Sequence, residues 1–181
     1  MFDGLLSALG IRSDPARRAR AWVGKGRYHL GGGADGDSPT PLDKNGASEC
    51  SRFVFWAWRR TKRLPKGVTM GGYGEANTTA MVADALGAQN VVALVPVGAE
   101  VRPGDAVVYP GVDTDGDGDR DRIGHTGLVV EVPKDFVYTG PSSLARLRIV
   151  HCNAGPAPAI DETGGHTWAR RQDSIVVRLR A

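Results

Sequence analysis

The sequence has few cysteines and lacks any long hydrophobic run. Only two cysteines, Cys50 and Cys152, occur among the 181 residues, which excludes a disulfide-rich scaffold and a four-cysteine zinc site. No apolar stretch approaches the ~20 residues that a membrane-spanning helix needs, so we expect no membrane span. Arginines cluster near residues 17–20 and 59–63, but no helix-turn-helix, zinc-finger or RNA-binding motif accompanies them. Nucleic acid is therefore not an expected partner.

The length fits one domain of ordinary size, and the predicted helices come before most of the strands. This order predicts an α+β fold with an antiparallel sheet. Residues 1–20 combine apolar side chains at helical spacing with a basic end, so we expect an amphipathic helix or arm. Residues 21–181 are expected to form a single domain and the protein to be a monomer. Asp3 stands where a signal peptide carries a basic residue, and we recognise no signal peptide.

Two helices and five strands are predicted from capping residues and β-branched runs. Cys50 begins the first helix, which we expect to end near Arg63 because Pro65 disfavours a helical conformation in the residue before it. Asn77 caps the second helix and Gly87 closes it. The predicted strands cover residues 91–97, 106–109, 125–132, 147–151 and 174–179.

Cys50 stands at the start of a predicted buried helix, because Phe53, Val54, Phe55 and Trp56 follow it closely. Free N–H groups and the helix dipole at this position stabilise a thiolate relative to a thiol. With a histidine nearby, we expect the pKa of the thiol to fall from ~8.5 to below neutrality. Cys50 is therefore the candidate nucleophile.

Two histidines lie at the ends of predicted strands, His125 at the start of one and His151 at the end of another. If these strands pair symmetrically about Tyr138, the histidines stand directly opposite each other, with Cβ atoms ~4.5–5.5 Å apart on one face. One imidazole would then take the thiol proton while the other fixes its tautomer. Asn153 is the alternative orienting residue. Cys152 is expected on the opposite face as a small buried hydrophobe.

Five segments occur in an order that resembles a known enzyme family. They are Tyr28-His29-Leu30-Gly31-Gly32, Glu49-Cys50-Ser51-Arg52-Phe53-Val54, Arg102-Pro103-Gly104-Asp105-Ala106-Val107, Gly124-His125-Thr126-Gly127-Leu128-Val129 and Ile149-Val150-His151. Together they are similar to the NlpC-type cysteine peptidases of bacterial cell walls and, more loosely, to the CHAP amidases. The resemblance spans about residues 22–155.

The resemblance implies a papain-like α+β fold, in which the helix that carries the nucleophile packs on an antiparallel sheet. It implies that Cys50 is the nucleophile, His125 the base and His151 the third member, with Tyr28 near the thiol to help bind the oxyanion. Residues 21–181 would form the catalytic domain and act on peptidoglycan or its peptide fragments, without an organic cofactor. A bacterial or phage protein that reaches the cell wall or periplasm after export or lysis fits this activity.

Two residues depart from the family pattern. Glu49 stands where the family has aspartate, and Arg52 stands where it has glycine. A large cation next to the nucleophile is expected to alter the substrate groove or to favour a substrate that carries a carboxylate.

An acidic loop precedes His125. Its carboxylates recur at every second position with glycine at the sixth, as in a calcium loop, but Gly124 replaces the bidentate glutamate at the twelfth. The candidate metal ligands are Asp113, Asp115, Asp117, Asp119 and Asp121. We expect either a structural Ca²⁺ that orders the strand of His125 or, as the alternative, a solvated acidic loop.

Calcium is accordingly expected to raise the melting temperature by several degrees relative to a chelator, because an ion bound only by the folded state stabilises it. Thermal unfolding in calcium and in chelator measures this effect. Identical melting curves would remove the calcium hypothesis.

The sequence favours a cysteine hydrolase, either an endopeptidase or an amidase, that cleaves amide bonds in peptidoglycan stem peptides through a thioester. One alternative is an acyltransferase or transglutaminase-like enzyme with the same triad. Another is a non-catalytic, calcium-stabilised binding module whose cysteine is structural. A zinc site made by Cys50, His125, His151 and Cys152 lacks the compact ligand spacing of known zinc sites.

Overall fold

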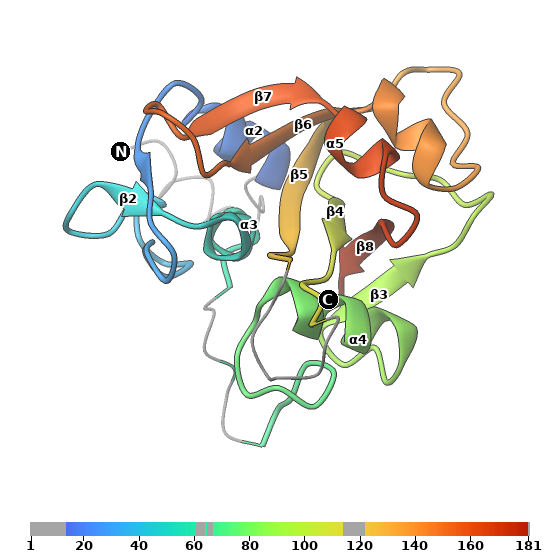
Figure 1. Ribbon diagram of the computed structural model, residues 1–181, viewed down its shortest axis with the longest axis horizontal. Coiled ribbons are helices and arrows are strands. Elements are labelled where there is room, and N and C mark those ends of the chain that lie inside the picture. The colour runs from blue at the N-terminus through green and yellow to red at the C-terminus, as the bar shows by residue number, and fades with distance from the viewer. Residues whose placement is uncertain (1–13, 61–63, 65–66, 114–121, 181) are drawn as a thin grey trace, which may run out of the picture.

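The computed structural model describes residues 14–60, 64, 67–113 and 122–180 (Figure 1). In chain order the elements are α2 (Pro15–Arg20), β1 (Arg27–Tyr28), β2 (Ala47–Ser48), α3 (Cys50–Ala57), α4 (Thr78–Leu86), β3 (Val92–Val95), β4 (Ala106–Tyr109), β5 (His125–Glu131), the 3₁₀ helix η1 (Pro141–Arg146), β6 (Arg148–Cys152), β7 (Ile160–Gly164), α5 (His166–Ala169) and β8 (Ile175–Leu179).

A six-stranded sheet organises the domain, in the order β3-β8-β4-β5-β6-β7, and every pairing in it is antiparallel. The five predicted strands are all present, whereas β7 and α5 were not expected. A separate pair of short parallel strands, β1 and β2, leads directly into α3. The predicted α+β fold, with the Cys50 helix packed on an antiparallel sheet, is confirmed.

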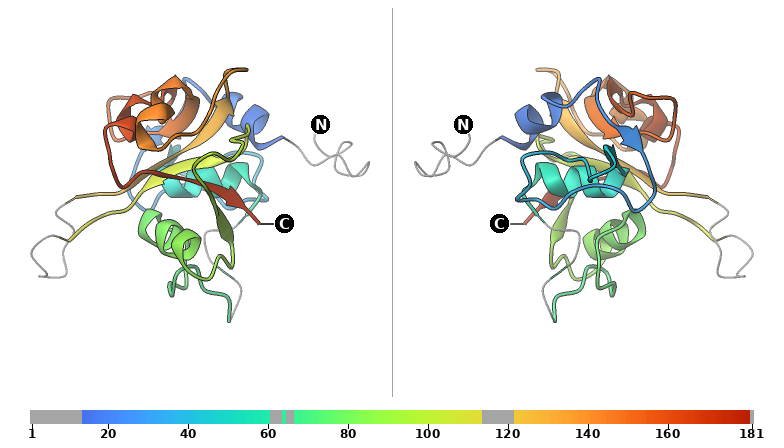
Figure 2. Two further views of the ribbon diagram at one scale, coloured as in Figure 1. Left: turned by 90° about the vertical axis from the view of Figure 1, so that its right-hand side faces the viewer. Right: turned by 90° about the vertical axis from the view of Figure 1, so that its left-hand side faces the viewer.

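Alternate residues of the central strands face two separate cores. Leu128 and Val150 pack with α2, α3 and α4 on one face, whereas Val129 and Ile149 pack with η1 and α5 on the other. Figure 1 shows β5 between α3 and α5, and the two views in Figure 2 face these two sides in turn. Cys152 is fully buried in the first core, as the alternation predicted.

Helix α3 ends at Ala57, several residues before the expected end near Arg63. Arg59 adopts a left-handed backbone with φ of 55°, and the N–H groups of Arg59 and Arg60 donate back to carbonyls of the last turn at 2.9 and 2.8 Å. This pair of bonds is a Schellman ending. Gly36 lies so close to it that a methyl group there would be 2.4 Å from the Arg60 nitrogen. The helix therefore ends where the loop of Gly36 packs against it, and not at the residue before Pro65 as expected.

Helix α4 forms between the residues that were expected to bound it. The Asn77 side chain accepts a hydrogen bond from the Ala80 N–H at 2.9 Å, and Gly87 follows the last residue of the helix. In the described part of the chain, none of the helices has the length and apolar character to cross a membrane.

Candidate active site

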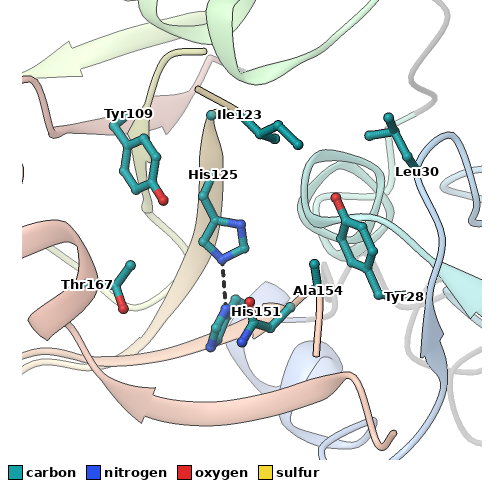
Figure 3. A pocket seen from close by; sticks show the side chains of 10 residues that line it. Tyr28, Leu30, Tyr109, Ile123, His125, His151, Ala154 and Thr167 are labelled. Atoms are coloured by element: carbon teal, nitrogen blue, oxygen red, sulfur yellow. Dashed lines mark hydrogen bonds between the residues drawn. The ribbon is translucent and has the colours of Figure 1, made fainter. Parts of the chain in front are cut away.

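The two strand histidines are in contact. Leu128 pairs with Val150, where the symmetric arrangement expected Arg148, so the register is displaced by two residues and His125 is not directly opposite His151. A displacement by two keeps both side chains on one face of the sheet. His125 Nε2 lies 2.8 Å from His151 Nδ1, and the rings meet edge to face with centroids 5.0 Å apart (Figure 3).

The second ring nitrogen of His125 takes no part in this contact, and no hydrogen bond joins it to another described residue. Figure 3 shows that nitrogen turned toward the side of the cleft where Tyr28 stands and α3 passes. When His125 carries its proton on Nε2, it donates to His151 Nδ1, and its own Nδ1 keeps a lone pair. In this tautomer His125 is available as a base.

Trp168 of α5 packs against both imidazoles. Its ring is nearly parallel to that of His125, with centroids 5.3 Å apart, and perpendicular to that of His151, with centroids 5.4 Å apart. Gly127 makes room for this arrangement, since a methyl group there would lie 3.1 Å from the indole and 3.0 Å from the His151 Cβ. The indole is fully buried, so it limits the orientations that both histidines can adopt.

Burial determines the charge of the histidine pair. Burial, with a smaller contribution from the neighbouring His151, lowers the pKa of His125 to about 3. Burial also lowers the pKa of His151, although the charge of Asp161 on the next strand raises it. Both rings are therefore neutral at neutral pH.

The depressed pKa of His125 predicts a loss of stability in acid. The unfolded chain binds a proton at this residue below a pH of about 6.5 and the folded chain only near 3, so the stabilisation is complete above 6.5 and is lost as the pH falls toward 3. We expect about 1–2 kcal/mol less unfolding free energy at pH 5 than at pH 8 from this group. Urea unfolding at both pH values should show a smaller difference in His125→Gln. His166→Gln, at an exposed position, is the control, and equal pH dependence in all three proteins would contradict this account.

Cys50 is the first residue of α3, and its side chain is only 6% exposed. Its sulfur accepts a hydrogen bond from the backbone N–H of Thr126, the residue that follows His125. Burial nevertheless raises the pKa of the thiol to about 11, with a smaller contribution from the charge of Glu49 and against the lowering effect of the backbone N–H groups. The shift is opposite to the expected one, because desolvation outweighs the helix N-terminus. The resting pair is a neutral thiol and a neutral imidazole.

Glu49 holds the loop that carries Tyr28 against the start of α3. One carboxylate oxygen accepts from the Gly31 N–H at 2.6 Å, and the other accepts from the Ser51 hydroxyl at 2.8 Å. The parallel pairing of Tyr28 with Ser48 completes the attachment. Burial raises the pKa of Tyr28, with a smaller contribution from Cys50. Tyr28 therefore keeps its hydroxyl proton and can donate a hydrogen bond within the cleft.

Arg52 does not occupy the cleft. Its guanidinium donates to the Gly33 carbonyl at 3.1 Å, and its aliphatic stem lies so close to Gly33 that a methyl there would be 2.6 Å from Arg52 Cδ. The expectation that this cation alters the substrate groove is therefore wrong. Arg52 supports the glycine-rich loop instead.

A cleft with two adjoining lobes brings the candidate residues together. The lobe at Cys50 has a volume of about 300 Å³. The lobe at His125 and His151 has a volume of about 250 Å³ and also includes Asn153, which lies beyond the end of β6. The lobes share four lining residues, Tyr28, Leu30, Ile123 and Gly124. Every predicted catalytic residue thus lines one cleft, and the hydrogen bond of His125 goes to His151.

The structure bears on the two predicted metal sites in different ways. Of the calcium ligands, Asp115, Asp117, Asp119 and Asp121 lie outside the described residues, and Asp113 is described. Among the residues that the structure describes, no group of three or more histidine, cysteine or acidic side chains is arranged to hold a metal ion. The alternative zinc site, whose four residues are all described, is therefore not formed.

Three residues next to the histidines were not recognised from the sequence. Trp168 follows a segment without strand or helix periodicity, so nothing in the sequence pointed to it. Gly127 gave a usable signal, because glycine inside a strand often marks a close approach of another group. Ile123, which is 64% exposed at the cleft, gave none.

Comparisons with known proteins find likeness only at the level of structure. No family model matches the sequence, and no curated protein sequence matches it either. Similar solved structures include NlpC2 from Trichomonas vaginalis, with 14% identity, a TM-score of 0.43, and coverage of 93% of this chain and 47% of that one. The crystal structure of Ly7917 has 15% identity, a TM-score of 0.47, and coverage of 90% and 60%. The chain spans only about half of the first and three fifths of the second, and identities this low concern the fold alone.

Proposed function

We propose that the protein is a cysteine hydrolase that cleaves amide bonds in peptidoglycan stem peptides, with Cys50 as nucleophile, His125 as base and His151 as the residue that orients it. The contact between His125 Nε2 and His151 Nδ1 at 2.8 Å carries the proposal. It leaves one basic nitrogen of a neutral ring in a cleft that Cys50 also lines. A single buried histidine often has a purely structural role. Two histidines in contact, in a cleft that a buried thiol also lines, are less readily explained by structure alone.

The reaction would proceed in two steps. The Cys50 sulfur attacks the amide carbonyl while His125 Nδ1 takes the thiol proton, and the C–N bond then breaks as His125 returns that proton to the leaving amine. This step yields a thioester and a free amine. Water next attacks the thioester with His125 as base, which releases a carboxylic acid and regenerates the thiol. Because the resting thiol is neutral, its proton is transferred during the attack and not before it.

Tyr28 is proposed to stabilise the oxyanion that forms in each step. It lines both lobes and is neutral, so its hydroxyl can donate to an oxygen that gains charge at the attacked carbonyl. Asn153 lines the lobe of the histidines and stays the alternative orienting residue.

Peptidoglycan as substrate is supported by the order of the five sequence segments and by the net charge. The formal charge of +3 favours association with an anionic polymer. The wall that the two lobes share is open to solvent, because Leu30 and Ile123 are largely exposed, and this supports the entry of a polymer segment.

Digestion of purified cell walls tests the proposal. The wild type is expected to release soluble peptide fragments that mass spectrometry identifies, and Cys50→Ala is expected to lower release by at least about a thousandfold, because the nucleophile is absent. Cys152→Ala is the matched control, since this second thiol is fully buried in the core and lines neither lobe of the cleft. Equal release by the wild type and Cys50→Ala would contradict the proposal.

Acyl transfer is the second candidate, and the lobe at His125 favours it because the described residues of its wall are uncharged. An acceptor amine with an apolar substituent could replace water in that lobe. The same digestion with added glycinamide distinguishes the two, because transfer yields fragments that carry the added amine.

A further inference from the structure

The two lobes of the cleft differ in charge. The lobe at Cys50 is lined by two acidic residues, Glu49 and Glu75. Apart from the two neutral histidines, the described residues that line the other lobe carry no ionisable group except tyrosine. Among the described residues, a substrate that crosses the cleft therefore meets an acidic wall at one end and an uncharged wall at the other.

Glu75 is the acidic residue that is free to recognise a ligand. Glu49 is buried, and its two oxygens are engaged by Gly31 and Ser51. Glu75 is exposed at the cleft, and it forms no ion pair with any described residue. An exposed carboxylate in a cleft, with no ion pair to a described residue, is suited to a primary amine of a substrate.

The uncharged lobe presents apolar side chains to solvent. Leu30 is 66% and Ile123 is 64% exposed, and both stand where the two lobes join. Tyr109 and Ala154 continue this wall beside His125 (Figure 3). Apolar side chains that remain exposed along a cleft commonly contact an apolar part of a ligand.

The proposed reaction determines which side of the cleaved bond each lobe binds. His125 returns its proton to the leaving amine, so the residue on the amine side of the broken bond lies in the lobe of the histidines. The acyl group becomes attached to Cys50, so the residue on the acyl side lies in the lobe with Glu75. This assignment rests on the proposed function.

We infer that the preferred substrate is an amide whose acyl-side residue carries an amine and whose amine-side residue is uncharged, with a small apolar side chain. Stem peptides contain alanines, a γ-linked glutamate and a diamino acid. The bond that fits both lobes is the one from the carboxyl group of the diamino acid to the alanine that follows it. The bond from glutamate to the diamino acid places an anion in the acidic lobe and a cation in the apolar one.

A synthetic lysine-type stem peptide tests this inference. Mass spectrometry of L-Ala-γ-D-Glu-L-Lys-D-Ala-D-Ala after digestion is expected to show cleavage after lysine at least about tenfold faster than cleavage before it. Acetylation of the lysine Nε should lower kcat/KM about two- to fivefold in the wild type, as expected for one exposed charge pair. The same acetylation should have little effect in Glu75→Gln. Glu100→Gln, at an exposed glutamate outside the cleft, should behave as the wild type.

A binding measurement separates this inference from the proposed function. Calorimetric titration of Cys50→Ala with the same peptide and its acetylated form should show a difference in Kd that Glu75→Gln removes. If that difference is present but the wild type cleaves nothing, the subsite stands and the hydrolase proposal fails. If the wild type cleaves before lysine as fast as after it, or ignores acetylation, the inference is overturned and the hydrolase proposal survives.

Discussion

Replacement of His151 by alanine is expected to lower kcat/KM for stem-peptide hydrolysis by about a hundred- to ten-thousandfold. The His125 ring is held by its bond to His151 at 2.8 Å. Without an acceptor at His151 Nδ1, the proton of His125 is free to move to the nitrogen that must act as base. The loss should appear mainly in kcat, because His151 orients the base and is not proposed to contact substrate.

His151→Asn distinguishes this role from a merely structural one. The asparagine side-chain oxygen still accepts a hydrogen bond from His125 Nε2, so we expect at least about tenfold more activity than in His151→Ala. Asn153→Ala tests the rival assignment and is expected to lose less than about tenfold. A large loss in Asn153→Ala, together with an active His151→Ala, would transfer the orienting role to Asn153.

Substitution of Gly127 by alanine is expected to have the second large effect. The added methyl would lie 2.5 Å from Ile149 Cγ2 and within 3.1 Å of the His151 Cβ and the Trp168 ring. Contacts this short force neighbouring groups to move, and overpacking in a core destabilises by about 1–3 kcal/mol. Because two of these neighbours hold His125, activity should fall at least about tenfold even at temperatures where the variant is folded.

Gly74→Ala is the matched control for this substitution. Gly74 has no heavy atom within 4 Å of the position that a methyl group would occupy and no positive φ, so its unfolding free energy should change by less than about 0.5 kcal/mol. Urea unfolding and turnover of the same peptide measure both variants. Wild-type stability and activity in Gly127→Ala would show that the histidine face tolerates expansion, which would contradict the packing described for Trp168.

The candidate site was largely predictable from local patterns. Strand alternation placed His125 and His151 on one face and Cys152 on the other, and this survives a register error of two because the period of a strand is two. The helix start at Cys50 followed from the apolar run behind it. These predictions depend on short stretches of sequence, which explains their success.

The remaining features depend on contacts between distant segments. The register of β5 and β6 includes an irregularity between Val129 and Glu131 that no local signal specifies. Strand β7 contains the polar residues Asp161 and Glu162, and it forms by pairing with the edge of β6. The pKa of the Cys50 thiol was mispredicted for a similar reason, since burial by the whole fold outweighs the local helix N-terminus.

Intact-mass spectrometry of the protein during turnover of an activated amino-acid ester tests the central claim most directly. Transfer of an acyl group to Cys50, located by peptide mapping, is the predicted result, with Cys152 unmodified. His125→Ala should acylate at least about a hundredfold more slowly. An acyl group on another residue, or acylation of His125→Ala at the wild-type rate, would contradict the assignment of a thiol nucleophile served by a histidine base.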